Sequence, residues 1–169
     1  MSGFLNKKTV LRVKNILNEI APEIELMALN TTARSAEHAA KSLNKDVGSI
    51  VKSILVKDQN DHFYLCLCSG DKKLQFKKIS EILDRNVSKA TAEEVKLQTG
   101  FSIGGVCPVG HLKPPKRVLL DTHLKRFETI YTAGGHPFVV FATTYKKLLQ
   151  ITNAEPIDIT SLKLFLSTT

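Results

Sequence analysis

Two apolar stretches near the middle of the chain decide the fold: IVKSILVK at residues 50–57 and HFYLCLC at residues 62–68. Both are rich in the β-branched, aromatic and aliphatic residues that favour strands, and the polar turn DQND separates them. We therefore predict two neighbouring strands of one sheet.

Lys52 is the most informative residue of the first stretch. A period of two places it on one strand face with Ile50, Ile54 and Val56, and the opposite face is also largely apolar. Such a strand is expected to be covered on both sides, and a covered lysine needs a partner or a cavity. Two interpretations stay open. Lys52 either lines a substrate pocket, where its ammonium binds a carbonyl or phosphate oxygen, or it lies near the sheet edge and reaches water.

Helices are predicted on both sides of this strand pair. Apolar residues at helical spacing mark residues 9–20, after Thr9 as a possible cap, and Ser35 can cap a second helix. Alternating lysines and aliphatic residues over 72–84 predict an amphipathic helix. The segment TAEE at residues 91–94 forms a capping box, which marks the start of a further helix.

Shorter strands complete the pattern, and we expect them at residues 25–29, 117–121, 128–132 and 138–142, with a last amphipathic piece from Thr160. Helices mixed with paired strands in an irregular order predict an α+β (mixed α/β) fold. We expect residues 1–169 to form one domain. Neither the dinucleotide-binding GxGxxG motif nor the phosphate-binding GxxxxGK[ST] motif occurs.

Composition narrows the class of protein. The chain has 169 residues, 43% of them hydrophobic, and a net charge of +8. It is therefore expected to be globular, with a polyanionic partner such as nucleic acid. No segment approaches the roughly 20 apolar residues that span a bilayer, and the N-terminus lacks the apolar core of a secretion signal. Only 7% of residues are aromatic, which argues against a base-stacking platform.

The three cysteines are too few for a disulfide framework and predict free thiols in a reducing cytoplasm. Their spacing makes a zinc site improbable, and we expect no metal or cofactor. Cys66 and Cys68 fit a strand core. Cys107 has His111 nearby, so a cysteine nucleophile stays open as an alternative to an inert loop thiol.

Two glycine-bearing segments are candidate ligand loops. GGVCPVG at residues 104–110 combines flexible glycines with a proline, which lets backbone N–H groups approach a ligand. TAGGHP at residues 132–137 predicts a tight hairpin at Gly134–Gly135, and His136 either points into a site or decorates that turn.

Four segments in order resemble the YbaK/EbsC family of free-standing aminoacyl-tRNA deacylases and prolyl-tRNA synthetase-associated editing domains. These segments are TARSAEHAA (32–40), VKSILV (51–56), TGFSIGGVCPVGH (99–111) and TAGGHP (132–137). The similarity extends from the first helix to Leu149. It implies a strongly curved mixed β-sheet surrounded by helices, and a pocket for the aminoacyl end of tRNA.

The resemblance also implies an activity and the residues that carry it. The activity is hydrolysis, in trans, of the ester of a mischarged tRNA, with alanine or cysteine on tRNA(Pro) as leading substrates. Lys52 is expected to orient the ester or terminal phosphate, and the G-x-x-x-P loop from Gly104 to Pro108 to hold the aminoacyl carbonyl. That loop includes Gly105, Val106 and Cys107. Further substrate contacts are expected from Ser53, Gly134, Gly135 and His136.

The partner implied is the acceptor end of aminoacyl-tRNA, with prolyl-tRNA synthetase as a second candidate and with neither DNA nor a membrane. The alternative function is a non-catalytic module of the same fold that binds tRNA or a synthetase.

Overall fold

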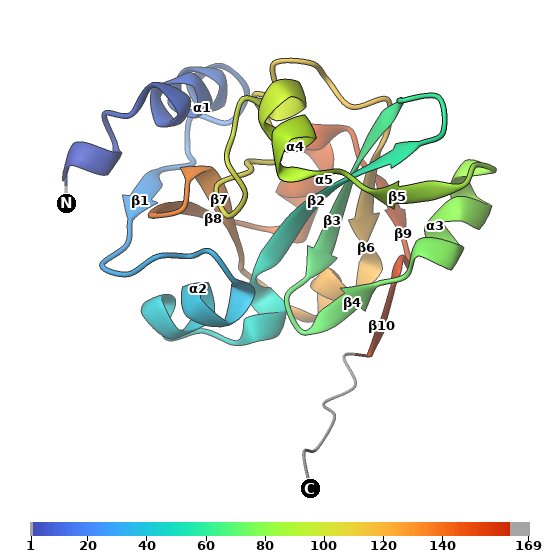
Figure 1. The fold of residues 1–169 in the computed structure, drawn as a ribbon. Coiled ribbons are helices and arrows are strands. Elements are labelled where there is room, and N and C mark those ends of the chain that lie inside the picture. Colours follow the sequence, from blue (N-terminus) through green and yellow to red (C-terminus); the bar gives the residue numbers. More distant parts are fainter. Residues whose placement is uncertain (1, 163–169) are drawn as a thin grey trace, which may run out of the picture.

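The computed structural model describes residues 2–162. Its centre is a five-stranded mixed sheet in the order β5-β2-β3-β6-β9 (Figure 1). The sheet is mixed in strand direction. Strand β2 is antiparallel to its neighbours β3 and β5, whereas β6 is parallel to its neighbours β3 and β9. The strands are β2 (Val51–Asp58), β3 (Phe63–Ser69), β5 (Val87–Lys89), β6 (Val118–Asp121) and β9 (Glu155–Ile157).

The two stretches that open the sequence analysis form the β2–β3 hairpin, as predicted, with Lys52 opposite Cys68. Both faces of this hairpin are covered. Helix α3 (Phe76–Leu83) packs Ile79 against the face that carries Cys66, and α5 (Tyr145–Thr152) packs Leu148 against the face that carries Leu65. The sheet therefore buries apolar side chains on both sides, which explains its near-continuous hydrophobic sequence.

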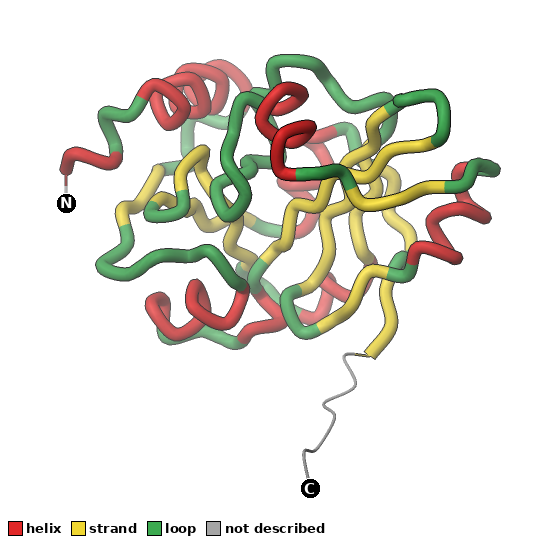
Figure 2. The backbone as a smooth tube through the Cα atoms, viewed as in Figure 1, coloured by secondary structure: helices red, strands yellow, loops and turns green. Residues whose placement is uncertain are grey.

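A second sheet adjoins the first. It has the order β1-β8-β7 and consists of β1 (Leu26–Ala28), β7 (Ile130–His136) and β8 (Val139–Thr143). A parallel bridge between Ile50 and Tyr131 joins β7 to the start of β2. The strands thus follow one curved surface that does not close into a barrel (Figure 2). A short pair, β4 (Lys72–Leu74) with β10 (Thr160–Leu162), flanks the larger sheet.

Three further helices surround the sheets, and their ends follow the capping signals of the sequence. They are α1 (Lys8–Ile20), α2 (Ala36–Leu43) and α4 (Ala92–Thr99). Ser35 caps α2 by accepting a hydrogen bond from the His38 amide, and Thr91 and Glu94 form the predicted capping box of α4. Glu94 also pairs with Lys57 at 2.5 Å, which fastens α4 to β2.

Three local predictions within residues 8–138 are corrected. Helix α1 begins at Lys8, so Thr9 lies inside it and does not cap it. The helix predicted over 72–84 begins only at Phe76, because residues 72–74 pair with β10 as strand β4. The predicted hairpin at Gly134–Gly135 is wrong: both glycines lie in β7 at a bulge between Ala133 and His136, and the turn follows at Pro137 and Phe138.

Three-residue 3-10 helices occur at Ser2–Phe4 and Val47–Ser49, and a longer one at Thr122–Arg126. The end of the chain, predicted as an amphipathic piece from Thr160, begins as strand β10, and its remainder lies outside the described residues. Within residues 2–162, no helix is both long enough and apolar enough to cross a lipid bilayer.

Candidate functional site

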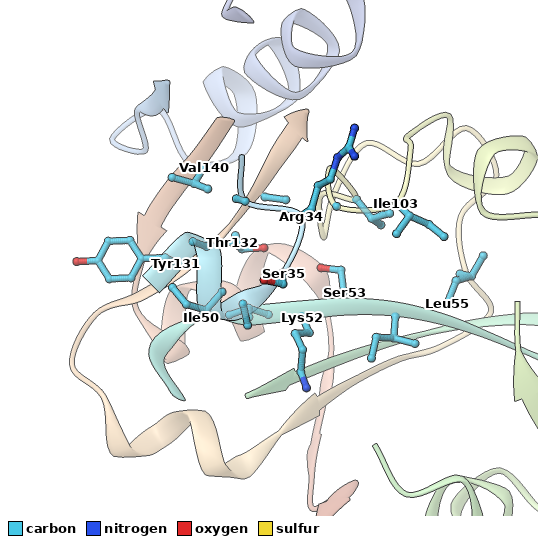
Figure 3. Close-up of a pocket in the computed structure, with 18 of the residues that line it drawn as sticks. Arg34, Ser35, Ile50, Lys52, Ser53, Leu55, Ile103, Tyr131, Thr132 and Val140 are labelled. Atoms are coloured by element: carbon cyan, nitrogen blue, oxygen red, sulfur yellow. The ribbon is translucent and has the colours of Figure 1, made fainter. Parts of the chain in front are cut away.

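The candidate site is a cavity of about 260 Å³ at the place where the two sheets diverge (Figure 3). We call it the apolar cavity. One wall is β2, the facing wall is the β7–β8 hairpin, and the remaining sides come from the start of α2, the loop before Val106, and the β5–α4 region. Its lining includes Arg34, Ser35, Ile50, Lys52, Ser53, Leu55, Ala90, Val95, Ile103, Gly104, Val106, Tyr131, Thr132 and Val140.

The cavity exists because the outer edge of β2 changes its neighbour along its length. At its start, Ile50 bridges to Tyr131 of β7; at its end, Val56–Asp58 pair with β5. Between these points, β2 has no strand partner on this edge. Backbone polar groups in such a gap are available to a ligand.

Ser53 lies in this gap. The backbone oxygen of Leu55 faces the outer edge, where it accepts a hydrogen bond from the Ala90 amide at 3.0 Å. In an antiparallel strand, alternate residues turn their N–H and C=O groups the same way. The peptide groups of Ser53 therefore also face the open edge, and its side-chain hydroxyl points to the cavity side of β2 (Figure 3).

Lys52 contributes to the wall of the cavity, but its ammonium does not point into it. Figure 3 shows its side chain directed away from the side of β2 that carries Ser53 and Leu55. Its Nζ donates a hydrogen bond to the backbone oxygen of Lys72 at 2.5 Å, at the start of β4. The face assignment from the period of two is right, whereas the expectation that the ammonium lines the pocket does not match this arrangement.

The loop that begins at Gly104 closes another side of the cavity. Gly104 has a φ of +88° and packs against Arg34, where an added Cβ would lie 3.1 Å from the Arg34 Cα. Gly104 and Val106 line the cavity, but Gly105, Cys107 and Pro108 do not. The Gly105 amide donates to the Ser102 oxygen at 2.9 Å and so closes the turn.

Cys107 is fully buried in the core cluster with Phe101 and Phe141, and burial raises the pKa of its thiol to about 12. The imidazole of His111 hydrogen-bonds the Cys107 backbone oxygen at 2.7 Å through Nε2. Burial also lowers the pKa of His111. A neutral imidazole bound to a carbonyl oxygen does not activate the thiol, so this pair lacks the arrangement of a cysteine nucleophile.

The second glycine segment meets the first. A Cβ added to Gly105 would lie 2.9 Å from the His136 Cα, so the two backbones are in close contact. Gly135 and His136 belong to a different cavity, however, and Gly134 lines neither. The His136 ring packs beside Phe4 and Phe138, and burial, together with the charge of Lys7, lowers its pKa.

This second cavity, which we call the basic cavity, has a volume of about 550 Å³. It lies at the start of α1 and shares Arg34 and Ile103 with the apolar cavity. Its lining comprises Lys7, Lys8, Thr9, Arg34, Lys96, Ser102, Ile103, Gly135, His136 and Pro137. Four of these side chains are cationic and none is acidic, so the cavity favours an anionic ligand.

Comparison with known proteins identifies the family. Residues 31–151 match the family model described as the aminoacyl-tRNA editing domain. The chain belongs to the aminoacyl-tRNA editing domain family. The resemblance stated from the four sequence segments is thereby confirmed.

Individual proteins similar to this editing domain were also found. A crystal structure described as a candidate trans-editing enzyme for prolyl-tRNA synthetase is 34% identical, with a TM-score of 0.86 over 92% of this chain and 98% of that one. The uncharacterised protein YwhH of Bacillus subtilis is 32% identical over 75% of this chain and 80% of its own length. The candidate Cys-tRNA(Pro)/Cys-tRNA(Cys) deacylase EbsC of Enterococcus faecalis is 23% identical over 75% and 77% of the two chains.

Sequence reasoning missed several residues that line the editing domain's apolar cavity, above all Thr132, Tyr131 and Arg34. Tyr131 and Thr132 lie just before Ala133 and the glycine pair Gly134–Gly135, and Arg34 lies inside the segment TARSAEHAA. The alternation of side chains along β7 could have indicated which of its residues share a face. It did not reveal that β7 bridges to the start of β2, because that bridge links positions far apart in the chain.

One group of side chains has the composition of a metal site. Ligand atoms of Asp121, His123 and Asp158 lie within 4.8 Å of one another. Hydrogen bonds explain this closeness: Asp121 accepts from His123 Nδ1 at 2.7 Å and, through its other oxygen, from Thr160 at 3.1 Å. None of these residues lines either cavity, so we interpret the group as a structural link between β6 and β10.

Proposed function

We propose that this chain is a trans-editing aminoacyl-tRNA deacylase that acts as a single domain. It hydrolyses the ester between a small, mischarged amino acid and the 3′ end of tRNA(Pro). The observation that carries this proposal is the apolar cavity beside the unpaired edge of β2, in a chain of the aminoacyl-tRNA editing family. The enzyme class expected from the sequence agrees with the family's description and with the names of two relatives.

The cavity has room for a small aminoacyl group. Its volume of about 260 Å³, bordered largely by aliphatic side chains, accommodates a short side chain such as that of alanine or cysteine. The name of the relative EbsC includes a cysteinyl ester of tRNA(Pro).

The chemistry needs few groups, because an aminoacyl ester is already activated. Positioning the ester and stabilising the oxyanion are sufficient for substantial acceleration. The backbone N–H of Ser53 faces the open edge, and the loop at Gly104 brings further backbone close to it. We assign these groups to the aminoacyl carbonyl, and no Ser-His-Asp triad is required.

We assign Lys52 to the ester or the terminal phosphate region. In the present conformation its ammonium is held by the Lys72 oxygen. Because β2 is an edge strand at this point, the long side chain can leave that carbonyl and wrap around the edge when an anionic ligand arrives.

The basic cavity is our candidate for the nucleotides of the acceptor end. It adjoins the apolar cavity through Arg34 and Ile103, so an ester in one places the preceding phosphates in the other. Lys7, Lys8 and Lys96 then contact phosphate oxygens, which positions the substrate without reading its sequence. Association with prolyl-tRNA synthetase, named in the structural match, completes the proposal.

Single-turnover deacylation of a panel of mischarged tRNA(Pro) species tests this function. We expect the wild type to hydrolyse at least one small aminoacyl ester. We expect Lys52→Ala and Lys52→Met to lose activity by about a hundredfold or more, the range for losing one electrostatic contact to the reacting ester. The methionine variant keeps the apolar stem in place.

Lys73→Met is the matched control, since Lys73 is the exposed neighbour of Lys72 on β4. Full activity of both Lys52 variants would remove Lys52 from the mechanism. Survival of every ester with wild-type protein, while tRNA still binds, would favour the non-catalytic binding module instead.

A further inference from the structure

The apolar cavity contains two buried hydroxyl groups that have no partner. The Oγ of Ser53 and the Oγ1 of Thr132 are both inaccessible to solvent, and neither has a hydrogen-bond partner within the described residues. They come from opposite walls, β2 and β7. Figure 3 shows both hydroxyls directed into the space between these walls and the start of α2.

Thr132 is the more telling of the two, because only 1% of its surface is exposed. The lining of the same cavity includes the aliphatic side chains of Ile50, Leu55 and Val140. A buried hydroxyl without a partner costs about 1–3 kcal/mol relative to one that is bonded. Two such groups facing one cavity indicate that the missing partner belongs to a ligand.

We propose that Ser53 and Thr132 form a specificity site for the side-chain hydroxyl of the aminoacyl group. The preferred substrate is then an ester of a β-hydroxy amino acid, serine or threonine, over an ester of the same size without the hydroxyl. This inference rests on the proposed function and narrows its substrate class.

A side-chain hydroxyl suits this site better than the α-ammonium group that every aminoacyl ester carries. A charged ammonium placed between two neutral hydroxyls in an apolar cavity is poorly compensated. The one carboxylate in the lining belongs to Glu37, an exposed residue in the first turn of α2. The cations of Arg34 and Lys89 also belong to the lining and repel a positive charge. The ammonium therefore stays toward the solvated rim, and the neutral hydroxyl enters.

The site would discriminate between aminoacyl esters because their side chains differ in the hydrogen bonds they can form with the two protein hydroxyls. A seryl hydroxyl can donate to one protein hydroxyl and accept from the other. A methyl group of the same size leaves both protein hydroxyls unpaired. Sites built around hydrogen bonds reject analogues that lack the bonding group far more strongly than apolar sites reject added polar groups.

The experiment compares seryl-tRNA(Pro) with 2-aminobutyryl-tRNA(Pro) in single turnover. The two side chains have the same shape and differ by a hydroxyl in place of a methyl group. We expect the wild type to prefer the seryl ester by at least about tenfold. Thr132→Val and Ser53→Ala should each lower this preference about tenfold, mainly through slower hydrolysis of the seryl ester.

Thr143→Val is the matched control. Thr143 is also buried and also carries a hydroxyl without a partner, but it does not line the cavity. Its substitution should leave the preference unchanged. Thr132→Val should unfold in urea at a midpoint no lower than that of the wild type, because it removes a buried hydroxyl that nothing satisfies. A purely structural hydroxyl would give a lower midpoint instead.

Three results would overturn the inference. Equal wild-type rates for the two esters would show that the hydroxyls do not read the side chain. An equal loss for both esters in Thr132→Val would assign the hydroxyls to a group that all substrates share. Absence of hydrolysis for every ester on the panel would reject the proposed function itself, and this inference with it.

Discussion

At the scale of single residues, the three thiols show how burial decides chemistry. Cys66, Cys68 and Cys107 are all buried, and burial raises the pKa of each thiol. For Cys68 and Cys107 the pKa is raised to about 12. At pH 8 such a thiol is ionised to about one part in ten thousand, so it is a poor nucleophile.

We therefore expect none of the three thiols to react with an aromatic disulfide reagent in the native protein at pH 8. All three should react in denaturant, and the absorbance of the released thiolate counts them. Thiol ionisation also makes stability depend on pH. Because burial raises the pKa values of the thiols in the folded state, the buried thiols stabilise the fold fully below about pH 8.5, the pKa of an unfolded thiol. As the pH rises further, the unfolded state ionises first and the free energy of unfolding declines. Rapid reaction of one native thiol would contradict this account and reopen the cysteine hypothesis.

Single residues also show what the sequence could and could not predict about the site. The period of two correctly placed Lys52 on a face with Ile54 and opposite Ser53. It did not reveal which face borders the cavity, because the cavity depends on the bridge between Ile50 and Tyr131. Similarly, alternation along β7 was the signal available for Thr132, which lies two residues before the glycine pair, and it did not show that this residue faces β2.

At the scale of elements, the two glycine segments act as one unit. The loop at Gly104–Val106 closes the cavity, and the backbone at Gly105 rests directly on that of His136 in β7. Both segments therefore set the shape of the site. The residues that make this contact do so without lining the apolar cavity themselves.

Gly105→Ala tests this contact. The added Cβ would lie 2.9–3.0 Å from three backbone atoms of His136, so the loop must move. We expect an unfolding free energy lower by about 1–3 kcal/mol, the usual cost of overpacking, and deacylation slower by about tenfold or more because the ester is misplaced. Urea unfolding and single-turnover rates measure the two effects.

Gly3→Ala is the control, since a Cβ there meets nothing within 4 Å. It should behave like the wild type in both assays. If Gly105→Ala also matched the wild type, the loop would not depend on its contact with β7.

Local signals predicted elements well where short-range chemistry decides them. The Ser35 cap and the Thr91–Glu94 box were readable because their partners lie three residues apart. Strand β4 was mistaken for the start of a helix because its partner, β10, lies far along the chain. Pairing partners of that kind leave no mark on the local pattern.

At the scale of the whole molecule, the arrangement of the two cavities connects charge to function. The net charge of +8 is shared over many surface positions, but four cations gather in the basic cavity without an acidic residue in its lining. Arg34 and Ile103 border both cavities. One ligand can therefore place an anionic chain in the first and an apolar or hydroxyl-bearing tip in the second. The composition predicted a polyanionic partner, but only the fold locates where it would bind.

The most direct test of this account is a crystal structure of the chain with a non-hydrolysable analogue of the substrate. A suitable ligand is the trinucleotide CCA with serine joined to the terminal ribose through an amide in place of the ester. We predict that the seryl group occupies the apolar cavity with its hydroxyl bonded to Ser53 and Thr132, and that the preceding phosphates lie along Lys8 and Arg34. A seryl group bound outside the apolar cavity would contradict the central claim that this cavity is the editing site.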